Sequence, residues 1–216
     1  MTAPAHHLTD EWLLDYASGA ASEPVALMVA THLSFCPTCR ANAAKLEAIG
    51  GRMLETAPPV AVSADAWSRI AARLDEPAPV PAPAPPVPPG VPLPLASYLS
   101  HGLDGAAWSR IGFGVSLAAL PCIEHRGFKS GLLRIGAGRA FAHHAHRGEE
   151  MLLVLRGSFD DQTGHYGIGD VAVYDEDVAH RPVAGPDGEC ICLALTSAPI
   201  RMTGFFTRLL NPFIRS

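Results

Sequence analysis

The sequence lacks any long apolar segment and any large excess of charge. No apolar stretch approaches the roughly 18 residues that a membrane-spanning helix requires, and the first residues do not follow the pattern of a signal peptide. Charged residues make up 17% of the 216 residues and hydrophobic residues 48%, proportions that are typical of a globular protein. We therefore expect a cytoplasmic protein that makes no membrane contact.

The sequence also lacks basic clusters. Residues 1–76 contain nine acidic and five basic residues, and residues 95–216 contain twelve and eleven. Surfaces that bind nucleic acid are strongly basic, so we expect no direct contact with nucleic acid. The mildly acidic amino-terminal part suits a basic protein partner, although an ordinary solvated surface has the same composition.

Cysteines are few and lack the spacing of a disulfide framework. The five are Cys36, Cys39, Cys122, Cys190 and Cys192. In a reducing compartment, metal binding is a better explanation than a disulfide for the close pair, Cys36 and Cys39. The other three are interpreted as small buried hydrophobic residues, with a redox contribution as the alternative.

A proline-rich stretch divides the chain. Ten of the eighteen residues in 77–94 are proline and none is charged. Proline lacks an amide donor and fixes φ, so this stretch is predicted to be an extended, semi-rigid spacer, with a ligand for a proline-recognition module as the alternative. The predicted organisation is a helical domain over 1–76, a linker over 77–94 and a second domain over 95–216.

The residues before the linker have helical patterns. The expected helices are one capped by Thr9 and ended by Gly19, a second from Glu23 to about Phe35 capped by Ser22, a third from Pro37 to about Gly50–Gly51, and a fourth opened by Ser63 and Asp65. In the fourth helix Trp67, Ile70 and Leu74 recur at helical spacing and form one apolar face. Four short helices with so few large side chains make a thin core, and a unit below about 80 residues usually needs a metal or a partner to be stable.

The residues after the linker have strand patterns. Short apolar stretches at 131–135, 150–155, 171–174 and 190–196 are separated by glycine-containing turns. This spacing predicts an all-β barrel or sandwich. The apolar residues Phe205, Phe206, Leu209, Leu210 and Phe213 are expected to pack along the outside of this domain.

The amino-terminal part contains a set of candidate metal ligands. His32 and Cys36 lie one helical turn apart, and Cys39 follows in a Cys-Pro-Thr-Cys sequence at the start of the third helix. A helix N-terminus favours the thiolate form that binds metal. His7 is the expected fourth ligand and His6 is the alternative, which together predicts a closed, tetrahedral zinc site.

A second set of candidate ligands lies in the β domain. Gly138, His144, His146, Glu150 and Gly157 fit every fixed position of the first cupin motif. His144 and His146, two residues apart on a strand, are expected to point to the barrel interior, where Glu150 joins them. His143 and Glu149 are the alternatives in a shifted register; in the register expected above, each would point to the opposite face.

The second cupin motif is only partly present. Gly169 and His180 stand at the expected interval, but Asp175, Asp177 and Ala184 replace the usual Pro, Gly and Asn. The fourth ligand, His180, is therefore retained, while the turn before it is expected to differ. Three imidazoles and a carboxylate suit a second divalent metal, Zn, Mn, Fe or Ni.

These motifs together resemble a known family. The His32-x3-Cys36-x2-Cys39 motif with an upstream histidine resembles the zinc-binding anti-sigma domain, and with the linker and cupin motifs the whole chain is similar to the ChrR family of anti-sigma factors. The resemblance implies a two-domain fold, an all-α four-helix zinc-binding domain followed by an all-β cupin (double-stranded β-helix) barrel.

The resemblance also implies a function and a partner. Residues 1–76 would bind an extracytoplasmic-function sigma factor, with Trp67, Ile70 and Leu74 of the fourth helix as partner-binding residues, unless these side chains pack within their own domain. The cupin would respond to singlet oxygen or organic peroxide through its metal ligands and release the sigma factor. We expect a regulator without enzymatic activity. The alternatives are a metal-dependent cupin oxygenase or isomerase with an accessory zinc module, and a zinc adaptor for another protein or nucleic acid.

Overall fold

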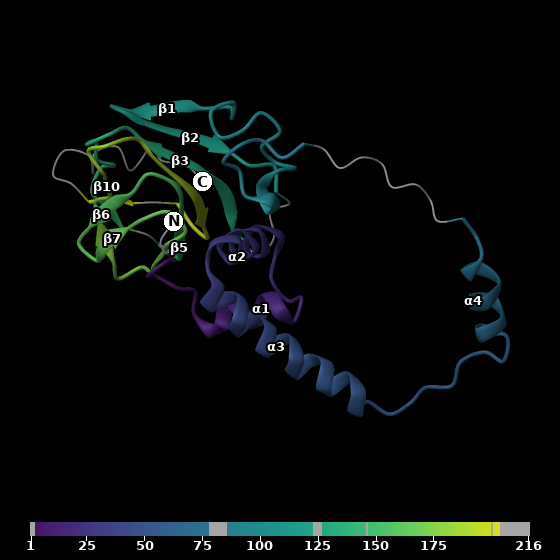
Figure 1. Ribbon diagram of the computed structural model, residues 1–216. Helices are drawn as coiled ribbons and strands as arrows, with labels where there is room; N and C mark the ends of the chain where they lie inside the picture. Colours follow the sequence, from purple (N-terminus) through teal and green to yellow (C-terminus); the bar gives the residue numbers. More distant parts are fainter. Residues whose placement is uncertain (1–2, 78–85, 123–126, 146, 200, 204–216) are drawn as a thin grey trace.

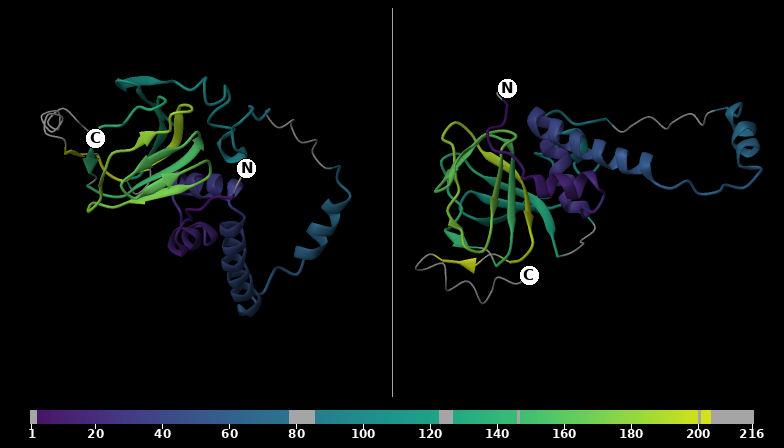
Figure 2. Two further views of the ribbon diagram at one scale, coloured as in Figure 1. Left: turned by 60° about the vertical axis from the view of Figure 1, so that its left-hand side comes forward. Right: turned by 90° about the horizontal axis from the view of Figure 1, so that it is seen from below.

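The fold combines an amino-terminal group of helices with an antiparallel β barrel, as the sequence predicted (Figure 1). The computed structural model describes residues 3–77, 86–122, 127–145, 147–199 and 201–203. The helices are α1 (Asp10–Ala17), α2 (Glu23–Phe35), α3 (Pro37–Thr56) and α4 (Ala66–Leu74). Helices α1 to α3 contact one another and α2 contacts the barrel, whereas α4 lies away from the other helices and from the barrel in every view (Figures 1 and 2).

The helices begin where the sequence predicted, but the capping differs. Thr9 and Ser22 have the extended backbone of an N-cap, yet neither side chain makes a capping hydrogen bond, and neither does the side chain of Asp65. Cys36 does cap α3, because its sulfur accepts a hydrogen bond from the amide of Cys39. The cap that forms therefore belongs to the candidate metal site.

Helix α3 is longer than predicted. It continues through Gly50 and Gly51 and ends at Thr56. A glycine inside a helix costs about 1 kcal/mol relative to alanine. The strong helix formers on both sides favour continuation of the helix, and an exposed ion pair between Arg52 and Glu55 at 2.7 Å adds a few tenths of a kcal/mol. The expectation that the helix ends at the glycine pair is wrong for this reason.

The β domain is a set of antiparallel strands in three sheets. The largest sheet has the order β1-β2-β3-β11-β5-β8, and two smaller sheets have the orders β10-β6-β7 and β12-β4-β9. The strands are β1 (Ser109–Gly112), β2 (Val115–Ala119), β3 (Lys129–Ile135), β4 (His144–Ala145), β5 (Glu150–Arg156), β6 (Phe159–Asp161), β7 (Gly164–Tyr166), β8 (Val171–Tyr174), β9 (Ala179–His180), β10 (Val183–Ala184), β11 (Cys190–Thr196) and β12 (Arg201–Met202). The four predicted apolar stretches form β3, β5, β8 and β11.

The helices and the barrel share one hydrophobic core. A single cluster of buried side chains joins Leu13 of α1 and Met28 of α2 to Leu132, Met151 and Leu193 of the barrel. A second cluster, which includes Phe159 and Tyr174, fills the barrel interior. The thin helical core predicted from the sequence is thus completed by apolar side chains of the β domain.

Two further segments join the parts. The short 3-10 helix η1 (Leu93–Leu95) contacts α2, and the Tyr98 hydroxyl donates to a carboxylate oxygen of Glu23 at 2.6 Å. Residues 3–9, which we call the amino-terminal strap, run along the barrel before α1 begins (Figure 2). Most of the predicted spacer, residues 78–85, and the apolar residues Phe205, Phe206, Leu209, Leu210 and Phe213 lie outside the described residues.

Candidate metal centres

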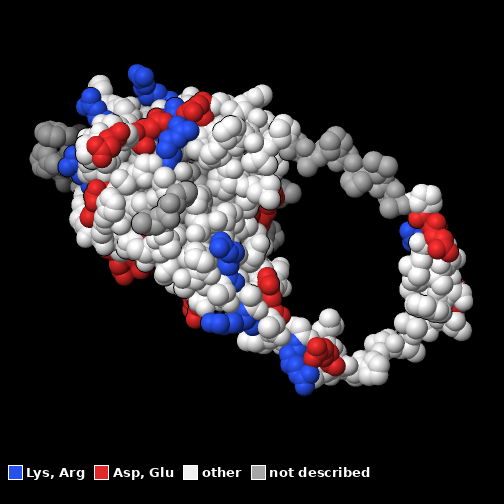
Figure 3. Space-filling view, viewed as in Figure 1, with Lys and Arg blue, Asp and Glu red and all other residues white. Residues whose placement is uncertain are grey.

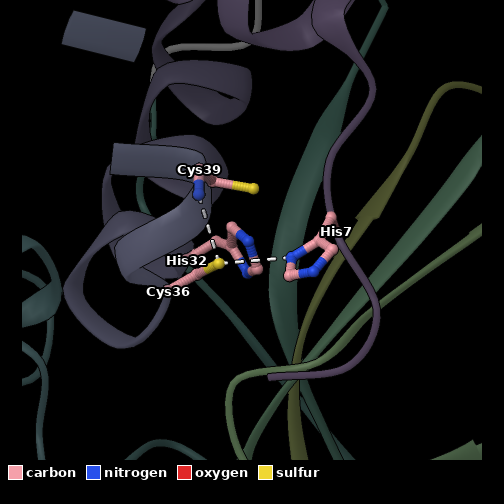
Figure 4. Close-up of side chains that lie close together, drawn as sticks. All are labelled: His7, His32, Cys36 and Cys39. Carbon is pink, nitrogen blue, oxygen red and sulfur yellow. Dashed lines mark hydrogen bonds between the residues drawn. The ribbon is translucent and has the colours of Figure 1, made fainter. Parts of the chain in front are cut away.

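The structure brings His7, His32, Cys36 and Cys39 together. One ligand atom from each lies within 4.8 Å of the others, and their side chains converge on one point (Figure 4). His7 comes from the strap, His32 from α2, Cys36 from the junction of α2 and α3, and Cys39 from the first turn of α3. Zinc–sulfur and zinc–nitrogen bonds in tetrahedral geometry place such atoms about 3.3–3.8 Å apart, so the group needs only a small contraction to enclose an ion.

The two thiols have different surroundings. The Cys36 sulfur accepts the amide hydrogen of Cys39 at 3.3 Å and lies 3.2 Å from Nδ1 of His7. Burial raises the pKa of Cys39 to about 11, and the neighbouring sulfur of Cys36 adds to the rise. In the metal-free protein the Cys39 thiol is therefore protonated at neutral pH, and a bound cation would favour loss of that proton.

His32 is held in the tautomer that suits a ligand. Its Nδ1 lies 2.8 Å from the carbonyl oxygen of Gly169, and because a carbonyl can only accept, Nδ1 carries the hydrogen. Nε2 is buried, has no hydrogen-bond partner among the described residues, and belongs to the convergent group. Burial lowers the pKa of His32, which favours the neutral imidazole that binds metal.

His6, the alternative ligand, lies against the barrel instead. Its Nε2 is 3.0 Å from the carbonyl oxygen of His165, and its ring centroid is 4.3 Å from that of Tyr166. The backbone alternation along the strap therefore directs His7 to the helical group and His6 to the β domain.

A second group lies inside the barrel and consists of His144, Glu150 and His180. Their ligand atoms also lie within 4.8 Å of one another, and all three side chains are buried. Nε2 of His180 is 3.1 Å from Nε2 of His144 and 3.2 Å from a carboxylate oxygen of Glu150. Three strands, β4, β5 and β9, each supply one residue, and His144 pairs directly with His180 across the ladder.

Residues around this group orient the two imidazoles. Nδ1 of His144 lies 2.8 Å from the carbonyl oxygen of Ala142, and Nδ1 of His180 lies 3.0 Å from the carboxylate of Asp161. The same carboxylate accepts a hydrogen bond from Tyr174 at 2.6 Å. Burial opposes ionisation of Asp161, but hydrogen bonds from Thr163, Tyr174 and His180 hold its pKa below the usual range. A carboxylate–histidine pair of this kind fixes the ring and raises its basicity toward a metal.

The remaining predicted residues of the barrel have different positions. His146 lies outside the described residues. His143 bonds to Thr203, and Glu149 is exposed, so neither register alternative joins the group. In the altered second motif, the Asp175 carboxylate accepts the amide of Asp177 at 3.1 Å, so an aspartate turn stands where proline and glycine are usual.

Cys190 and Cys192 form a buried pair of thiols on β11. Their sulfurs are 3.6 Å apart within the hydrophobic cluster of the barrel. The hydrogen bond with Cys190, together with burial, raises the pKa of Cys192 well above its ordinary value. The pair therefore packs as neutral thiols, in agreement with their interpretation as small hydrophobic residues.

Helix α4 presents the predicted apolar face to solvent. Trp67 is 72% exposed, Ile70 54% and Leu74 70%, and no residue of the helix is buried. The alternative, that these side chains pack within their own domain, does not describe this structure.

Comparison with known proteins gives first the class of the β domain. Residues 101–198 match the family described as the ChrR cupin-like domain. Among the described residues of this region, His144, Glu150 and His180 supply the imidazole and carboxylate groups of a cupin-type metal site, and they lie inside an antiparallel β barrel.

The whole chain has a close relative. It is 43% identical over 210 residues to the anti-sigma-E factor ChrR of Cereibacter sphaeroides, an alignment that covers 97% of this chain and 98% of the relative. It is also similar to a chain in the crystal structure of Rhodobacter sphaeroides SigE in complex with the anti-sigma ChrR, with a TM-score of 0.78 and 40% identity over 90% of this chain and 99% of that chain. The chain therefore belongs to the ChrR family of anti-sigma factors.

Family membership bears on two further predictions. Both relatives are anti-sigma factors, which agrees with the expectation of a regulator and not an enzyme. Among the described residues, no helix is both long enough and apolar enough to span a membrane.

Proposed function

We propose that this protein is a cytoplasmic, zinc-dependent anti-sigma factor that sequesters an extracytoplasmic-function sigma factor. The ChrR relative is an anti-sigma-E factor, and a similar chain binds SigE in the crystal structure named above. The similarity extends over both domains, so the sigma factor is the partner that the family supports for this chain.

The observation that carries the proposal is the unpartnered apolar surface of the helical part. On α4 the side chains of Trp67, Ile70 and Leu74 are mostly exposed, and the distal half of α3 adds the exposed side chains of Met53 and Leu54. On the face drawn in Figure 3, α4 is mostly uncharged, and the charged side chains there gather at and just beyond its carboxyl end. Exposed apolar helices of this kind are a binding surface for another protein.

Zinc is the metal proposed for the helical group. Two thiolates and two imidazoles form the closed donor set of a structural zinc site, and a structural zinc contributes about 10–16 kcal/mol of apparent binding free energy in small peptides. The ion would join the strap, α2 and α3 at one point. The surface of α1 to α3 that faces a partner would then depend on the ion for its shape.

The stress input is proposed to enter through the barrel. A second divalent ion, Zn, Mn, Fe or Ni, would be held by His144, Glu150 and His180, with His146 as the proposed fourth ligand. Oxidation or ligand exchange at this ion, caused by singlet oxygen or an organic peroxide, would change how the barrel holds the helices and release the sigma factor.

The zinc requirement is tested by Cys36→Ala and Cys39→Ala in the full chain. Each variant is expected to lose one metal ion per chain and, with it, the ability to copurify with and inhibit the cognate sigma factor, because the three joined segments separate. Metal content and sigma binding are measured on the same preparation. Inhibition that persists without the helical metal would contradict the structural role of zinc.

A further inference from the structure

One turn of the barrel contacts the helical metal group directly. This turn connects β7 and β8, spans residues 167–170, and is called the docking turn. Its residues make hydrogen bonds to two segments that supply ligands: α2, which carries His32, and the strap, which carries His7.

The first contact orients His32. The Gly169 carbonyl oxygen accepts the hydrogen of His32 Nδ1 at 2.8 Å and so leaves Nε2 facing the group. Gly169 has a φ of +90°, and a Cβ there would lie 2.7 Å from Cβ of Phe35 and 2.9 Å from Cγ of Pro4. Only glycine allows the barrel backbone to approach α2 and the strap this closely.

The second contact holds the strap. One carboxylate oxygen of Asp170 accepts the amide hydrogens of Ala5 at 2.7 Å and His6 at 2.9 Å, and the other oxygen accepts the amide of Gly167 at 2.8 Å. The side chain of Asp170 is buried. Because His7 follows His6 directly, this carboxylate fixes the backbone from which the His7 ligand projects.

The docking turn is bonded to the strand that begins with the barrel ligand. The amide of Gly169 donates to the carbonyl of Val154 at 2.8 Å, and the amide of Val154 donates to the carbonyl of Asp170 at 3.1 Å. Val154 lies in β5, which starts at Glu150. A single strand, β5, therefore connects the carboxylate of the barrel group to the turn that contacts the helical group.

We propose that Gly169 and Asp170 of the barrel are positioning residues for the helical metal site, so that this site reaches its full affinity only while the barrel is docked. The inference rests on the proposed metal site of the function above. Outer-shell partners of ligating histidines typically change metal affinity by about 10–100-fold when they are removed. Here the residues that orient the ligands belong to the barrel, so a structural change in the barrel alters the metal affinity of the helical site while all four ligands stay in place.

Cobalt(II) titration of the metal-free full chain tests this proposal. Cobalt bound by two thiolates has a sulfur-to-metal charge-transfer absorption, and the barrel group contains no sulfur, so this absorption reports the helical site alone. Asp170→Asn replaces one acceptor oxygen with an amide and is expected to weaken cobalt binding at the helical site about 10-fold. Equal affinity in Asp170→Asn and the unmodified chain would overturn the proposal.

Two further variants make the result independent of damage to the barrel. His6→Ala removes the contacts that the strap makes with His165 and Tyr166 of the barrel, while every barrel residue stays unchanged. Like Asp170→Asn, it is expected to weaken cobalt binding at the helical site. Asp187→Asn makes the same chemical change at an exposed position beside Gly188 and is expected to have no effect. If Asp170→Asn does not fold, unchanged affinity in His6→Ala overturns the proposal by itself.

The failure of the proposal is distinguishable from failure of the proposed function. If the thiolate absorption does not develop in the unmodified chain, the helical metal site is absent and both inferences fall. If it develops with the same affinity in every variant, the metal site stands and the outer-shell role of the docking turn is wrong.

Discussion

At the scale of single residues, the two candidate centres are built alike. In each, a buried histidine presents Nε2 to the group and bonds through Nδ1 to an oxygen that belongs to another element: Gly169 for His32, and Asp161 for His180. Since the second nitrogen is already committed, the ring cannot flip or change tautomer without breaking a buried hydrogen bond. One imidazole of each site is therefore oriented before any ion arrives, which reduces the conformational entropy that this side chain loses on binding.

Asp161→Asn is the residue-scale test of the barrel centre. One carboxylate oxygen of Asp161 accepts hydrogen bonds from Tyr174 and His180, and the other accepts them from Thr163. An amide has a single acceptor oxygen and can serve only one of these two sets, so the affinity of the barrel metal is expected to fall about 10–100-fold. Sigma binding is expected to remain, while release by singlet oxygen or organic peroxide is lost. Metal per chain and sigma release from the purified complex are the measurements.

The matched control is Asp160→Asn. Asp160 is the neighbour of Asp161 on β6, but its carboxylate pairs with His165 on the exposed face of the strand. This variant is expected to keep both the metal and the stress response. Loss of release in both variants would indicate a general weakness of β6 and not a role of the metal in sensing.

The ligands could be predicted from the sequence more readily than the residues that orient them. His32, Cys36 and Cys39 are close in sequence, and His144, Glu150 and His180 follow a spaced motif. Asp161, Gly169 and Asp170 act through contacts with elements that are distant in the chain, in the case of Asp170 more than 160 positions away. Local periodicity contains no information about such contacts, because the packing of the two domains creates them.

At the scale of elements, α2 differs from α1, α3 and α4 in how many residues it buries. Helix α2 buries seven of its residues, whereas α1 buries only Leu13, α3 buries only Cys39 and Ala43 near its beginning, and α4 buries none. The sequence predicted where these helices start, but it could not fix the end of α3. The cost of Gly50 and Gly51 competes with the propensity of their neighbours, and the two effects are of similar size.

Substitution on α4 is expected to affect partner binding without affecting the fold. Trp67→Ala and Ile70→Ala remove large exposed apolar side chains and are each expected to weaken sigma binding by about 2 kcal/mol, or roughly 30-fold, as anchor residues at an interface do. Thermal unfolding of the free chain should be unchanged because neither side chain is buried. Binding is measured by titration of the sigma factor with the full chain.

Ala72→Ser is the control for α4. Ala72 lies about 140–200° around the helix from the apolar face, at an exposed position. It is expected to leave the affinity within a factor of about two. Unchanged binding in Trp67→Ala and Ile70→Ala would show that α4 is not part of the sigma interface.

At the scale of the whole molecule, helices α1 to α3 and the barrel are packed together as one body. They share a hydrophobic cluster, the docking turn and the hydrogen bond from Tyr98 to Glu23. Sequence analysis predicted two domains with a stiff joint, and a helical part with a thin core that needs a metal or a partner to be stable. The contact between the helices and the barrel could not be predicted from the sequence, because the apolar residues that make it lie in segments that are far apart in the chain.

The contact at Tyr98 predicts a specific pH dependence of stability. The hydrogen bond to Glu23, with a smaller effect of burial, raises the pKa of Tyr98 to about 12. Since the folded protein favours the neutral phenol, its stabilising effect is complete below the unfolded pKa of about 10 and is lost as the pH rises toward 12. Tyr98→Phe is expected to lower the free energy of unfolding by about 1 kcal/mol at pH 7.

Denaturant unfolding of the two proteins between pH 7 and pH 12 checks this dependence. The difference in unfolding free energy between the unmodified chain and Tyr98→Phe should be constant up to about pH 9 and should shrink toward zero above pH 10. Comparing the two proteins at each pH cancels the titration of other groups. A difference that grows with pH would contradict the assigned direction of the shift.

The position of α4 has a consequence for the kinetics of dissociation. The chain joins both ends of this helix to the same body (Figure 1), so the helix cannot diffuse away after it dissociates from a bound partner. Its effective concentration near a partner that is still bound to that body is on the order of millimolar, so rebinding is intramolecular. Even weak contacts made by such a tethered helix lengthen the lifetime of a complex. The complex then dissociates quickly once the contacts made by the rest of the protein are lost.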